Sequence, residues 1–369
     1  MRRFIVVAIA ILALALCYPA RAEVLIGVAG PMTGTNAWYG EQMQRGSEMA
    51  VADINAAGGV LGQQVRLITE DDFCDPEQAI VAAQKLVGEG AIFVAGHFCS
   101  GASIPASKVY ETAGILQISP ASTNPLLTEQ GRANVFRLTS RDDADGVVAG
   151  NYLADHWGNK KIAILHDNTT FGKGLADLTK KQLNKRGVTE AIYEAYTPGK
   201  SDYSTEIAAL QAVGIAVLYV GGYHTEIALM ARTARDRGYS VQLVSGSVLQ
   251  TEEFGLIAGP AAEGALFTYV PDPRQIAEAA PIIERFRAEN FEPEGYTLFT
   301  YGAVQVWAQA VEKAGSLELQ AVIASLRKHK FNTIVGRIDF DDKGDLTSQS
   351  PISSPILYVW RGGKYLPLE

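Results

Sequence analysis

Short runs of apolar and β-branched residues alternate along this chain with longer segments of helical pattern, and this alternation constrains its fold more than any other feature. In the first third, the runs that predict strands are 24–29, 65–70, 91–95 and 115–118. The segments that predict helices between them are 38–55, 75–88 and 101–113. Strands alternating with helices of this length indicate βαβ units and a parallel sheet. Asp75 and Pro76 mark the start of one helix as its capping residue and first-turn proline.

The same alternation starts again after a seam near residues 139–142. The second set of predicted strands is 160–165, 188–193, 216–220 and 242–244. The predicted helices are 142–157, 171–186, 203–213 and 225–237. Two successive runs of this kind predict an α/β protein with two doubly wound lobes, each built on a parallel sheet. Because ligands bind at the carboxyl ends of strands in such sheets, the cleft between the lobes is the expected site.

The last hundred residues do not predict a third domain. They offer helices at 275–290, 298–314 and 319–328, followed by strand-like stretches at 335–340 and 356–360. We expect the chain to cross back and complete the lobes in turn. The N-terminal lobe would consist of 23–141 and 272–350, and the C-terminal lobe of 142–271 and 351–369. The several crossovers would then form a hinge.

The N-terminus carries the pattern of a secretory signal peptide. Two arginines precede an apolar run at 4–16, and small residues occupy the cleavage pattern at 20–22. The apolar run is shorter than the roughly 20 residues that span a bilayer comfortably. We therefore expect cleavage after Ala22 and export to the periplasm. An uncleaved anchor is one alternative, and a lipoprotein modified at Cys17 is another, although Leu16 does not fit the lipobox.

Loss of residues 1–22 would leave 347 of the 369 residues and would take the net charge from −8 to −11, because three arginines leave with it. Nucleic-acid binders carry a basic patch, so this balance argues against such a partner. Two cysteines would remain, Cys74 and Cys99. An even pair in an exported chain predicts a disulfide. A metal site that includes nearby His97 is the alternative, but no second ligand stands at metal-motif spacing.

The sequence offers little that points to catalysis. It contains no G-x-S-x-G elbow and no H-E-x-x-H motif, and the glycine-rich stretch 171–174 lacks P-loop or dinucleotide spacing. The acidic pair Asp142 and Asp143 could supply a general acid or a metal ligand. Such pairs more often lie in solvated loops or cap helices. We therefore expect a binding protein that is not an enzyme and that needs no cofactor.

Small hydroxyl-bearing loops at strand ends are more informative. Ser100 lies between a predicted strand and helix, at an N-cap position, where its hydroxyl and the free amides that follow would face the cleft. A helix N-terminus with free N–H groups attracts a carboxylate. The loop 119–123 follows the next strand in the same manner and offers both donors and acceptors. The alternative is that Ser100 and Thr123 only cap helices, which stabilises a helix by about 1 kcal/mol each.

At these loops the chain resembles the Leu/Ile/Val-binding proteins of branched-chain amino-acid ABC transporters, which are type I periplasmic binding proteins. The resemblance covers essentially the whole mature chain and rests on the order and spacing of several segments together. These are 30–34 (GPMTG), 52–55 (ADIN), 58–62 (GGVLG), 71–76 (DDFCDP), 96–100 (GHFCS), 119–123 (SPAST), 166–167 (HD), 221–224 (GGYH) and 343–345 (KGD). The resemblance implies the type I fold, a monomer, a small amino acid as ligand and inner-membrane permease subunits as partners.

The resemblance also implies roles for particular residues. Ser100 matches the serine that binds the ligand carboxylate, and Ala121 and Thr123 match residues that hold the carboxylate and the ammonium. Further matches are the cleft aspartate Asp142, the aromatic position Phe171, the second-lobe tyrosine Tyr223 and the side-chain pocket positions Tyr39 and Tyr296, with Trp38 adjoining them. Cys74 and Cys99 match the disulfide of the family.

One position departs from the family pattern. The family usually has Glu or Asp in the second lobe to pair with the ligand ammonium, and Ser247 occupies that place here. A charge-assisted hydrogen bond contributes about 1.5–3 kcal/mol against about 1 for a neutral one, so selection for an amino group should weaken. Asp142 could compensate. Alternatively, the ligand is an aromatic carboxylate or an amide or urea-like solute, or the chain is an amino-acid sensor domain.

Overall fold

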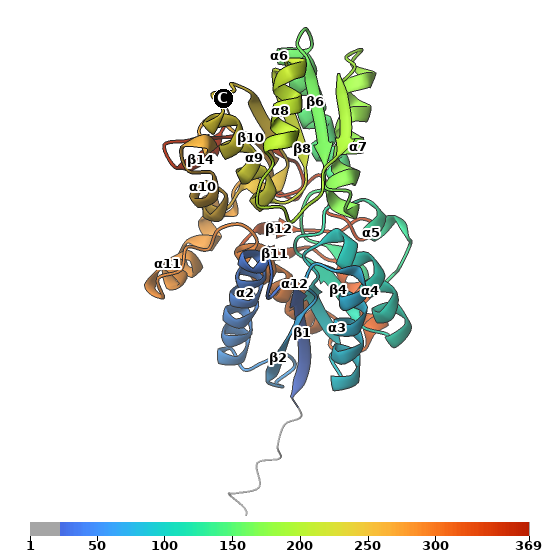
Figure 1. Cartoon of the computed structure of the whole chain (residues 1–369). Coiled ribbons are helices and arrows are strands. Elements are labelled where there is room, and N and C mark those ends of the chain that lie inside the picture. Colours follow the sequence, from blue (N-terminus) through green and yellow to red (C-terminus); the bar gives the residue numbers. More distant parts are fainter. Residues whose placement is uncertain (1–22, 369) are drawn as a thin grey trace, which may run out of the picture.

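The computed structural model describes residues 23–368 and has two α/β lobes, one above the other (Figure 1). The lower, N-terminal lobe surrounds a five-stranded sheet, and the upper, C-terminal lobe surrounds a seven-stranded sheet. The predicted signal peptide lies outside the described residues. Within 23–368, no helix combines the length and apolar character needed to cross a membrane.

The sheet of the N-terminal lobe is entirely parallel, with strand order β2-β1-β3-β4-β5. Its strands are β1 (Val24–Gly30), β2 (Val65–Asp71), β3 (Phe93–Gly96), β4 (Leu116–Ser119) and β5 (Val135–Arg137). Its connecting helices are α2 (Ala37–Ala56), α3 (Pro76–Glu89), α4 (Ser100–Ala113) and the short α5 (Leu126–Glu129). Strands β3 and β4 are buried at every residue, as expected for a sheet with helices on both faces.

Helices α2, α3 and α4 begin and end within one residue of their predicted bounds, whereas α5 and β5 have no predicted counterpart. The Asp75 carboxylate caps α3 by accepting from the backbone N–H groups of Glu77 and Gln78, both at 2.9 Å, and Pro76 occupies the first turn. Gly90 closes the same helix in the left-handed conformation, with φ of 88°. Because β3 and β4 pair in parallel, their carboxyl ends lie at the same edge of the sheet, facing the other lobe.

The seven-stranded sheet has the order β14-β13-β10-β9-β8-β6-β7. Its parallel part comprises β6 (Ile162–His166), β7 (Ile192–Ala195), β8 (Val217–Gly221), β9 (Gln242–Ser245) and β10 (Leu266–Tyr269). Strands β13 (Ile356–Arg361) and β14 (Lys364–Pro367) extend it in antiparallel fashion. The helices are α6 (Asp142–Trp157), α7 (Thr170–Lys185), α8 (Ser204–Val213), α9 (His224–Asp236) and α10 (Glu252–Ala258).

Three of these strands differ from the expectation. Strand β7 begins at Ile192, four residues later than predicted, and β10 and β14 have no predicted counterpart. Strand β10 is only four residues long, and β14 is a largely exposed edge that contains lysine and proline. Neither has the long β-branched run that identifies a strand by pattern alone, so pairing with β9 and β13 decides their conformation.

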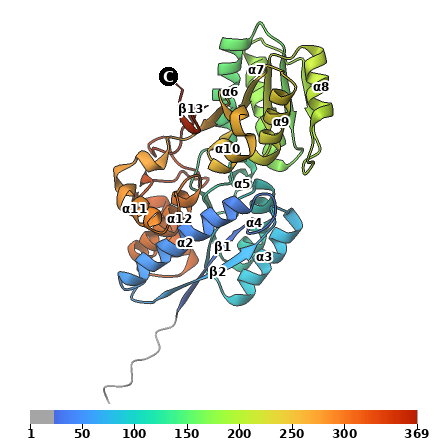
Figure 2. The same cartoon turned by 60° about the vertical axis from the view of Figure 1, so that its left-hand side comes forward.

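After β10 the chain continues with elements that pack on the N-terminal lobe. It forms α11 (Ala280–Ala288), α12 (Thr297–Ala314), α13 (Leu319–Lys328) and the antiparallel pair β11 (Phe331–Thr333) and β12 (Gly336–Ile338). Helix α12 packs against α2 and against β3 and β4, so the late segment completes one face of the early sheet (Figure 2). The predicted helix 275–290 begins only at Ala280, because a proline at 281 favours the first turn and breaks longer helices.

Between the lobes, a buried ion-pair cluster ties two crossovers together. The Arg137 side chain, at the end of β5, is fully buried, and its Nε donates to Asp345 Oδ1 at 2.8 Å. Arg141, just before α6, donates from Nη1 to Asp345 Oδ2 at 2.5 Å. Burial alone would raise the pKa of Asp345, but the charges and hydrogen bonds of the two arginines outweigh it and lower that pKa. Asp345 therefore stays ionised and fixes the crossover.

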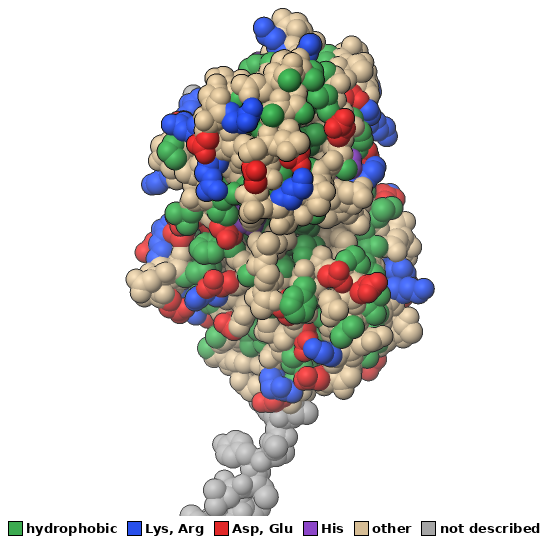
Figure 3. Space-filling model, in the orientation of Figure 1, with side chains coloured by type: hydrophobic (Ala, Val, Ile, Leu, Met, Phe, Trp, Pro, Cys, Tyr) green, Lys and Arg blue, Asp and Glu red, His purple; other side chains and the backbone are tan. Residues whose placement is uncertain are grey.

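Charged side chains are otherwise spread over the surface. On the face drawn in Figure 3, lysines and arginines are interspersed with aspartates and glutamates over both lobes, and no patch of one sign dominates. The net charge of −8 is thus not concentrated on this face.

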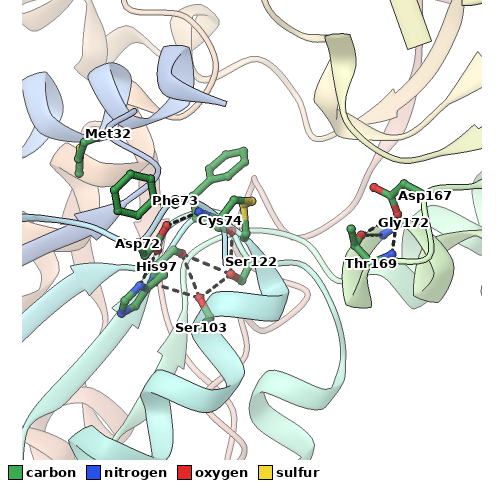
Figure 4. Close-up of a disulfide and its surroundings, with 12 residues drawn as sticks. Met32, Asp72, Phe73, Cys74, His97, Ser103, Ser122, Asp167, Thr169 and Gly172 are labelled. Atoms are coloured by element: carbon green, nitrogen blue, oxygen red, sulfur yellow. Dashed lines mark hydrogen bonds and ion pairs between the residues drawn. A yellow bond between two sulfur atoms is a disulfide. The ribbon is translucent and has the colours of Figure 1, made fainter. Parts of the chain in front are cut away.

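The predicted disulfide between Cys74 and Cys99 is confirmed, with a Cα–Cα distance of 5.4 Å. It joins the loop after β2 to the loop after β3, at the edge that faces the other lobe (Figure 4). The bridge therefore holds together two loops that border the cleft.

Replacing both cysteines, Cys74→Ser with Cys99→Ser, should lower the free energy of unfolding by about 3 kcal/mol. The closed loop spans a sequence separation of 25, and cross-linking a loop of this size restricts the unfolded chain by about that amount. Urea unfolding of the two proteins followed by circular dichroism measures the difference. Coincident unfolding curves would contradict the prediction, and wild type treated with reductant should match the double variant.

Candidate functional site

A narrow pocket lies where the two lobes meet, at the carboxyl ends of the parallel strands. Its walls are Phe98, Ser100, Ala121 and Thr123 from the N-terminal lobe, Phe171, Tyr223 and Val248 from the C-terminal lobe, and Tyr296 from the crossover before α12. Only about 10 Å³ of it is open to the centre of a water molecule, which is about the minimum that holds one water. The space that these walls leave open is therefore too small for a solute larger than water.

The polar part of the pocket belongs to the N-terminal lobe. Ser100 is the first residue of α4 and is 1% exposed, and its Oγ accepts from the Asn124 backbone N–H at 3.3 Å. The prediction that Ser100 is the N-cap of α4 is wrong, because Cys99 occupies that position. Cys99 forms no side-chain capping hydrogen bond. The first amides of any α-helix lack acceptors within the helix, so this end of α4 still presents N–H donors toward the cleft.

The second polar loop, 119–123, is held by hydrogen bonds within the loop and with His97 and Arg137. Ser119 Oγ accepts from the Ser122 backbone N–H at 2.9 Å and donates to the His97 carbonyl at 2.8 Å. Arg137 Nη1 donates to the carbonyls of Ser122 and Asn124 at 3.0 and 2.8 Å. The loop that contains Ala121 and Thr123 is thus anchored to β3 and to the buried hinge arginine.

His97 takes part in a buried network rather than a metal site. Its Nδ1 lies 2.6 Å from Asp72 Oδ2 (Figure 4). Its Nε2 lies 2.8 Å from the Tyr110 hydroxyl. Its carbonyl accepts hydrogen bonds from Ser103 and Ser119. Within residues 23–368, no group of three or more His, Cys, Asp or Glu is placed to hold a metal ion.

The apolar part of the pocket comes mainly from aromatic rings. Phe171 and Tyr223 of the C-terminal lobe have ring centroids 5.3 Å apart, and Phe98 meets Tyr296 edge to face at 5.0 Å. Tyr39 stacks on Phe98 at 4.4 Å but lies behind it and does not line the pocket. Phe98 and Val248 are wall residues that sequence reasoning missed, although each stands within two residues of an expected position.

Direct hydrogen bonds hold the lobes together around the pocket. The Tyr39 hydroxyl of α2 donates to the Val248 carbonyl of the opposite lobe at 2.7 Å. Asn124 Nδ2 donates to the Thr170 carbonyl across the cleft at 2.8 Å. The structure is therefore a closed arrangement, and closure positions Val248 over the pocket.

A third contact is centred on a buried carboxylate in the crossover before α12. Glu294 Oε1 accepts from Trp38 Nε1 at 2.9 Å and from Thr251 Oγ1 at 2.8 Å, so it joins α2 to the C-terminal lobe. Burial raises the pKa of Glu294, although these donors oppose the shift.

Three of the expected site residues lie behind the wall. Ser247 is 6% exposed, and its Oγ lies 3.3 Å from the Tyr296 hydroxyl. Tyr39 contacts Val248 as described above. Asp142 begins α6, and its backbone N–H donates to the Thr123 carbonyl at 2.9 Å. The structure thus gathers Ser100, Ala121, Thr123, Phe171, Tyr223 and Tyr296 around one space, and Tyr39, Asp142 and Ser247 directly behind it.

Asp142 and Asp145 form a buried acidic pair next to the pocket. They stand three residues apart in the first turn of α6 and are 1% and 2% exposed. Burial, followed by the charge of Asp145, raises the pKa of Asp142 to about 8, although the Thr123 hydroxyl and Arg137 oppose the shift. Burial raises the pKa of Asp145 to about 6 against the opposing hydroxyls of Thr268 and Ser140. At neutral pH the pair therefore carries roughly one negative charge.

Comparison with known proteins gives consistent matches. The model of the periplasmic binding protein family matches residues 23–353. Leu/Ile/Val-binding protein homolog 1 of Brucella suis is 46% identical over 343 residues, which cover 93% of this chain and 91% of that protein. A leucine binding protein of Thermotoga maritima superposes with a TM-score of 0.84 at 26% identity, covering 94% of this chain and 98% of that one.

A branched-chain amino acid transporter substrate binding protein of Streptococcus pneumoniae, solved in complex with isoleucine, is also similar. It has a TM-score of 0.83 at 25% identity and covers 93% of this chain and 98% of that one. These superpositions confirm the predicted fold of two α/β lobes.

Asp142→Asn should make the protein more stable at pH 8 and leave its stability nearly unchanged at pH 4. The folded-state pKa of Asp142, about 8, lies above the usual 3.8. The contribution of this carboxyl group to the free energy of unfolding is therefore fully present only below about pH 4, and it is lost as the pH rises toward 8. Asparagine does not ionise, and the gain in stability at pH 8 should be several kcal/mol, because each unit between the two pKa values corresponds to about 1.4 kcal/mol. Unfolding curves at pH 4, 6 and 8 measure it. The same pH dependence in both proteins would refute the burial argument.

Proposed function

The chain belongs to the periplasmic binding protein family, and from that membership we propose that it captures a small aliphatic amino acid between its lobes. Leucine, isoleucine and valine are the candidates that its named relatives suggest. The observation that carries the proposal is the pocket itself, which joins hydroxyl-bearing loops of one lobe to apolar rings of the other. Such a pocket suits a ligand with one polar and one apolar end.

The carboxylate of the ligand would bind at the N-terminal lobe. Ser100 supplies a hydroxyl at the start of α4, where the first amides and the positive end of the helix dipole favour an anion. The loop with Ala121 and Thr123 adds backbone donors and a second hydroxyl. Because Arg137 and His97 hold this loop from below, its groups are oriented before a ligand arrives.

The side chain of the ligand would pack against the apolar walls. Phe98, Phe171, Val248 and Tyr296 line that part of the pocket, and no lysine or arginine lines it among the described residues. Burying an aliphatic side chain of leucine size stabilises the complex by about 1.5–3 kcal/mol. A charged side chain would find no ion-pair partner on these walls.

Closure would link binding to transport. The ligand must bind the closed form better than the open one to shift the population, and contacts from both lobes provide this difference. We propose that the closed form is recognised by permease subunits of an ABC transporter in the inner membrane. The protein would reach the periplasm through a cleaved signal peptide at 1–22 and act there as a monomer, with hinge crossings near 142, 272 and 351.

A second candidate keeps the fold and changes the ligand. Ser247 is neutral where the resemblance implies an acid, and Phe98, Phe171, Tyr223 and Tyr296 make the pocket aromatic. An aromatic carboxylate or an amide would tolerate both features. The two candidates differ in whether the ligand needs an ammonium group.

Thermal unfolding in the presence of each amino acid tests the leading proposal. A ligand at 100 times its dissociation constant should stabilise the protein by about 2.7 kcal/mol, which raises the unfolding temperature measurably. We expect leucine, isoleucine or valine to give the largest shift. Stabilisation by benzoate and by none of the amino acids would favour the second candidate and reject the first.

Ser100→Ala should weaken leucine binding by roughly tenfold, because it removes a hydroxyl that can donate to the ligand carboxylate and charged hydrogen bonds contribute about 1.5–3 kcal/mol. Isothermal titration calorimetry on the purified full chain measures the change. Ser107→Ala is a suitable control, because Ser107 lies in the same helix and its hydroxyl bonds to a backbone carbonyl away from the pocket. Equal affinity of wild type and Ser100→Ala would remove Ser100 from the site.

A further inference from the structure

The pocket described above has no ionised side chain on its walls, yet two acids lie buried close behind them. The wall residues are all neutral, and the second-lobe position 247 is a serine. Asp142 and Asp145 both face inward from the first turn of α6. In each of them one oxygen, Asp142 Oδ2 and Asp145 Oδ1, has no hydrogen-bond partner among the described residues.

Asp145 is connected to the C-terminal wall through adjacent elements. Helix α6 packs on β10, where Thr268 is fully buried. A Cβ atom at Gly246 would lie 4.0 Å from Thr268 Oγ1, so the residue before Ser247 sits next to this hydroxyl. Ser247 in turn lies 3.3 Å from Tyr296, a wall residue. Because the Thr268 hydroxyl also acts on the Asp145 carboxyl group, neighbouring hydroxyl-bearing residues connect this acid to the pocket wall.

The acidic pair also affects the pKa of one wall residue, Tyr296. Burial raises the pKa of Tyr296 to about 12, and the charges of Asp145 and Asp142 add to the shift while Ser247 and Gln250 oppose it. The negative field of the pair therefore reaches the ring that borders the ligand. Charges separated by buried, water-poor protein interact more strongly than they would in water.

The charge of Arg137 acts on Asp142 and lowers its pKa, but no cation of the described chain forms an ion pair with either acid. Arg137 pairs with Asp345, and Arg141 is shared among Glu129, Asp143 and Asp345. Neither Asp142 nor Asp145 forms a salt bridge within residues 23–368. A buried carboxylate without a cation is costly, and a cationic group in the pocket would relieve that cost.

We propose that Asp145, together with Asp142, supplies the negative charge that selects a ligand with an ammonium group, in place of the acid that is absent at position 247. This inference rests on the proposed function and makes it more specific, since it predicts an α-amino acid rather than an uncharged amide or a simple carboxylate. Asp145 would act through the hydroxyl groups of Thr268, Ser247 and Tyr296. It is therefore a specificity-determining residue rather than a wall residue.

Two probes that differ only in the group of interest test the proposal. L-Leucine and L-2-hydroxy-4-methylpentanoate share the carboxylate and the aliphatic side chain, and a hydroxyl replaces the ammonium in the second. Titration calorimetry at pH 7.5 would compare wild type, Asp145→Asn and Asp143→Asn. Asp143 belongs to the same helical turn but pairs with Arg141 at the surface, so it is the matched control.

Asp145→Asn should lower the affinity for L-leucine by roughly tenfold and change the affinity for the hydroxy acid by less than about twofold, as expected for loss of one charge-assisted interaction. Asp143→Asn should change neither. Because asparagine keeps the shape of aspartate and removes a buried charge, the variant should fold, and ligand-free unfolding would show this. Ser247→Glu added to Asp145→Asn should recover part of the preference for leucine.

The outcomes separate the inference from the proposed function. Leucine binding that is unchanged in Asp145→Asn, or equal losses for both probes, would overturn the role of Asp145 and leave the amino-acid proposal standing. If wild type binds the hydroxy acid as tightly as leucine, the selection for ammonium is absent and the inference falls. If wild type binds no amino acid at all, the proposed function fails and the inference fails with it.

Discussion

The site depends most on the ion pair and the hydrogen bonds that the buried guanidinium group of Arg137 forms. A charge taken fully out of water must be paired and hydrogen-bonded, or it is strongly destabilising. Asp345, from a late crossover, provides the pairing. Arg137 Nη1 donates to the carbonyls of Ser122 and Asn124, and Nη2 donates to the Thr128 hydroxyl. The loop that carries Ala121 and Thr123 is therefore held by an arginine whose ion-pair partner lies 208 residues away in the sequence.

The two halves of the pocket have different physical roles. The N-terminal half is rigid, because the carbonyl of His97 and the side chain of Arg137 hold its loops from beneath. The C-terminal half is held at the pocket by hydrogen bonds between the lobes, such as that from the Tyr39 hydroxyl to the Val248 carbonyl. A ligand bound first to the rigid half would find its apolar contacts when the second half closes, which couples occupancy to shape.

Buried acids link stability to function in this protein. Glu294, Asp142 and Asp145 are all removed from water near the lobe boundary, and burial raises the pKa of each of them. Glu294 is compensated by donors from both lobes. Hydroxyl groups and Arg137 compensate Asp142 and Asp145 only in part, since neither acid has an ion-pair partner among the described residues and the pKa of each stays raised. We attribute their retention to the ligand that we propose they help to select. Sites of function often keep groups that stability alone would not favour.

Much of this architecture could be predicted from the sequence, because it follows from patterns that are local. The periodicity of β1, α2, β3 and α4, the cap at Asp75 and Pro76, the pairing of Cys74 with Cys99 and the hydroxyl-bearing loops after β3 and β4 are all encoded within short stretches. They determined a two-lobed α/β fold and indicated one side of the site.

Long-range packing decided the rest. Strands β10 and β14 exist because neighbouring strands pair with them, and α4 starts at Ser100 rather than after it. Val248 and Phe98 are wall residues, and Tyr39 lies behind Phe98, because of contacts between segments that are distant in the sequence. The position of Asp145 beside β10, far from it in sequence, has no local signature. Local propensity and residue spacing act over a few residues. The burial of side chains, the electrostatic field at the pocket and the contacts between the lobes depend instead on which distant segments of the chain pack together.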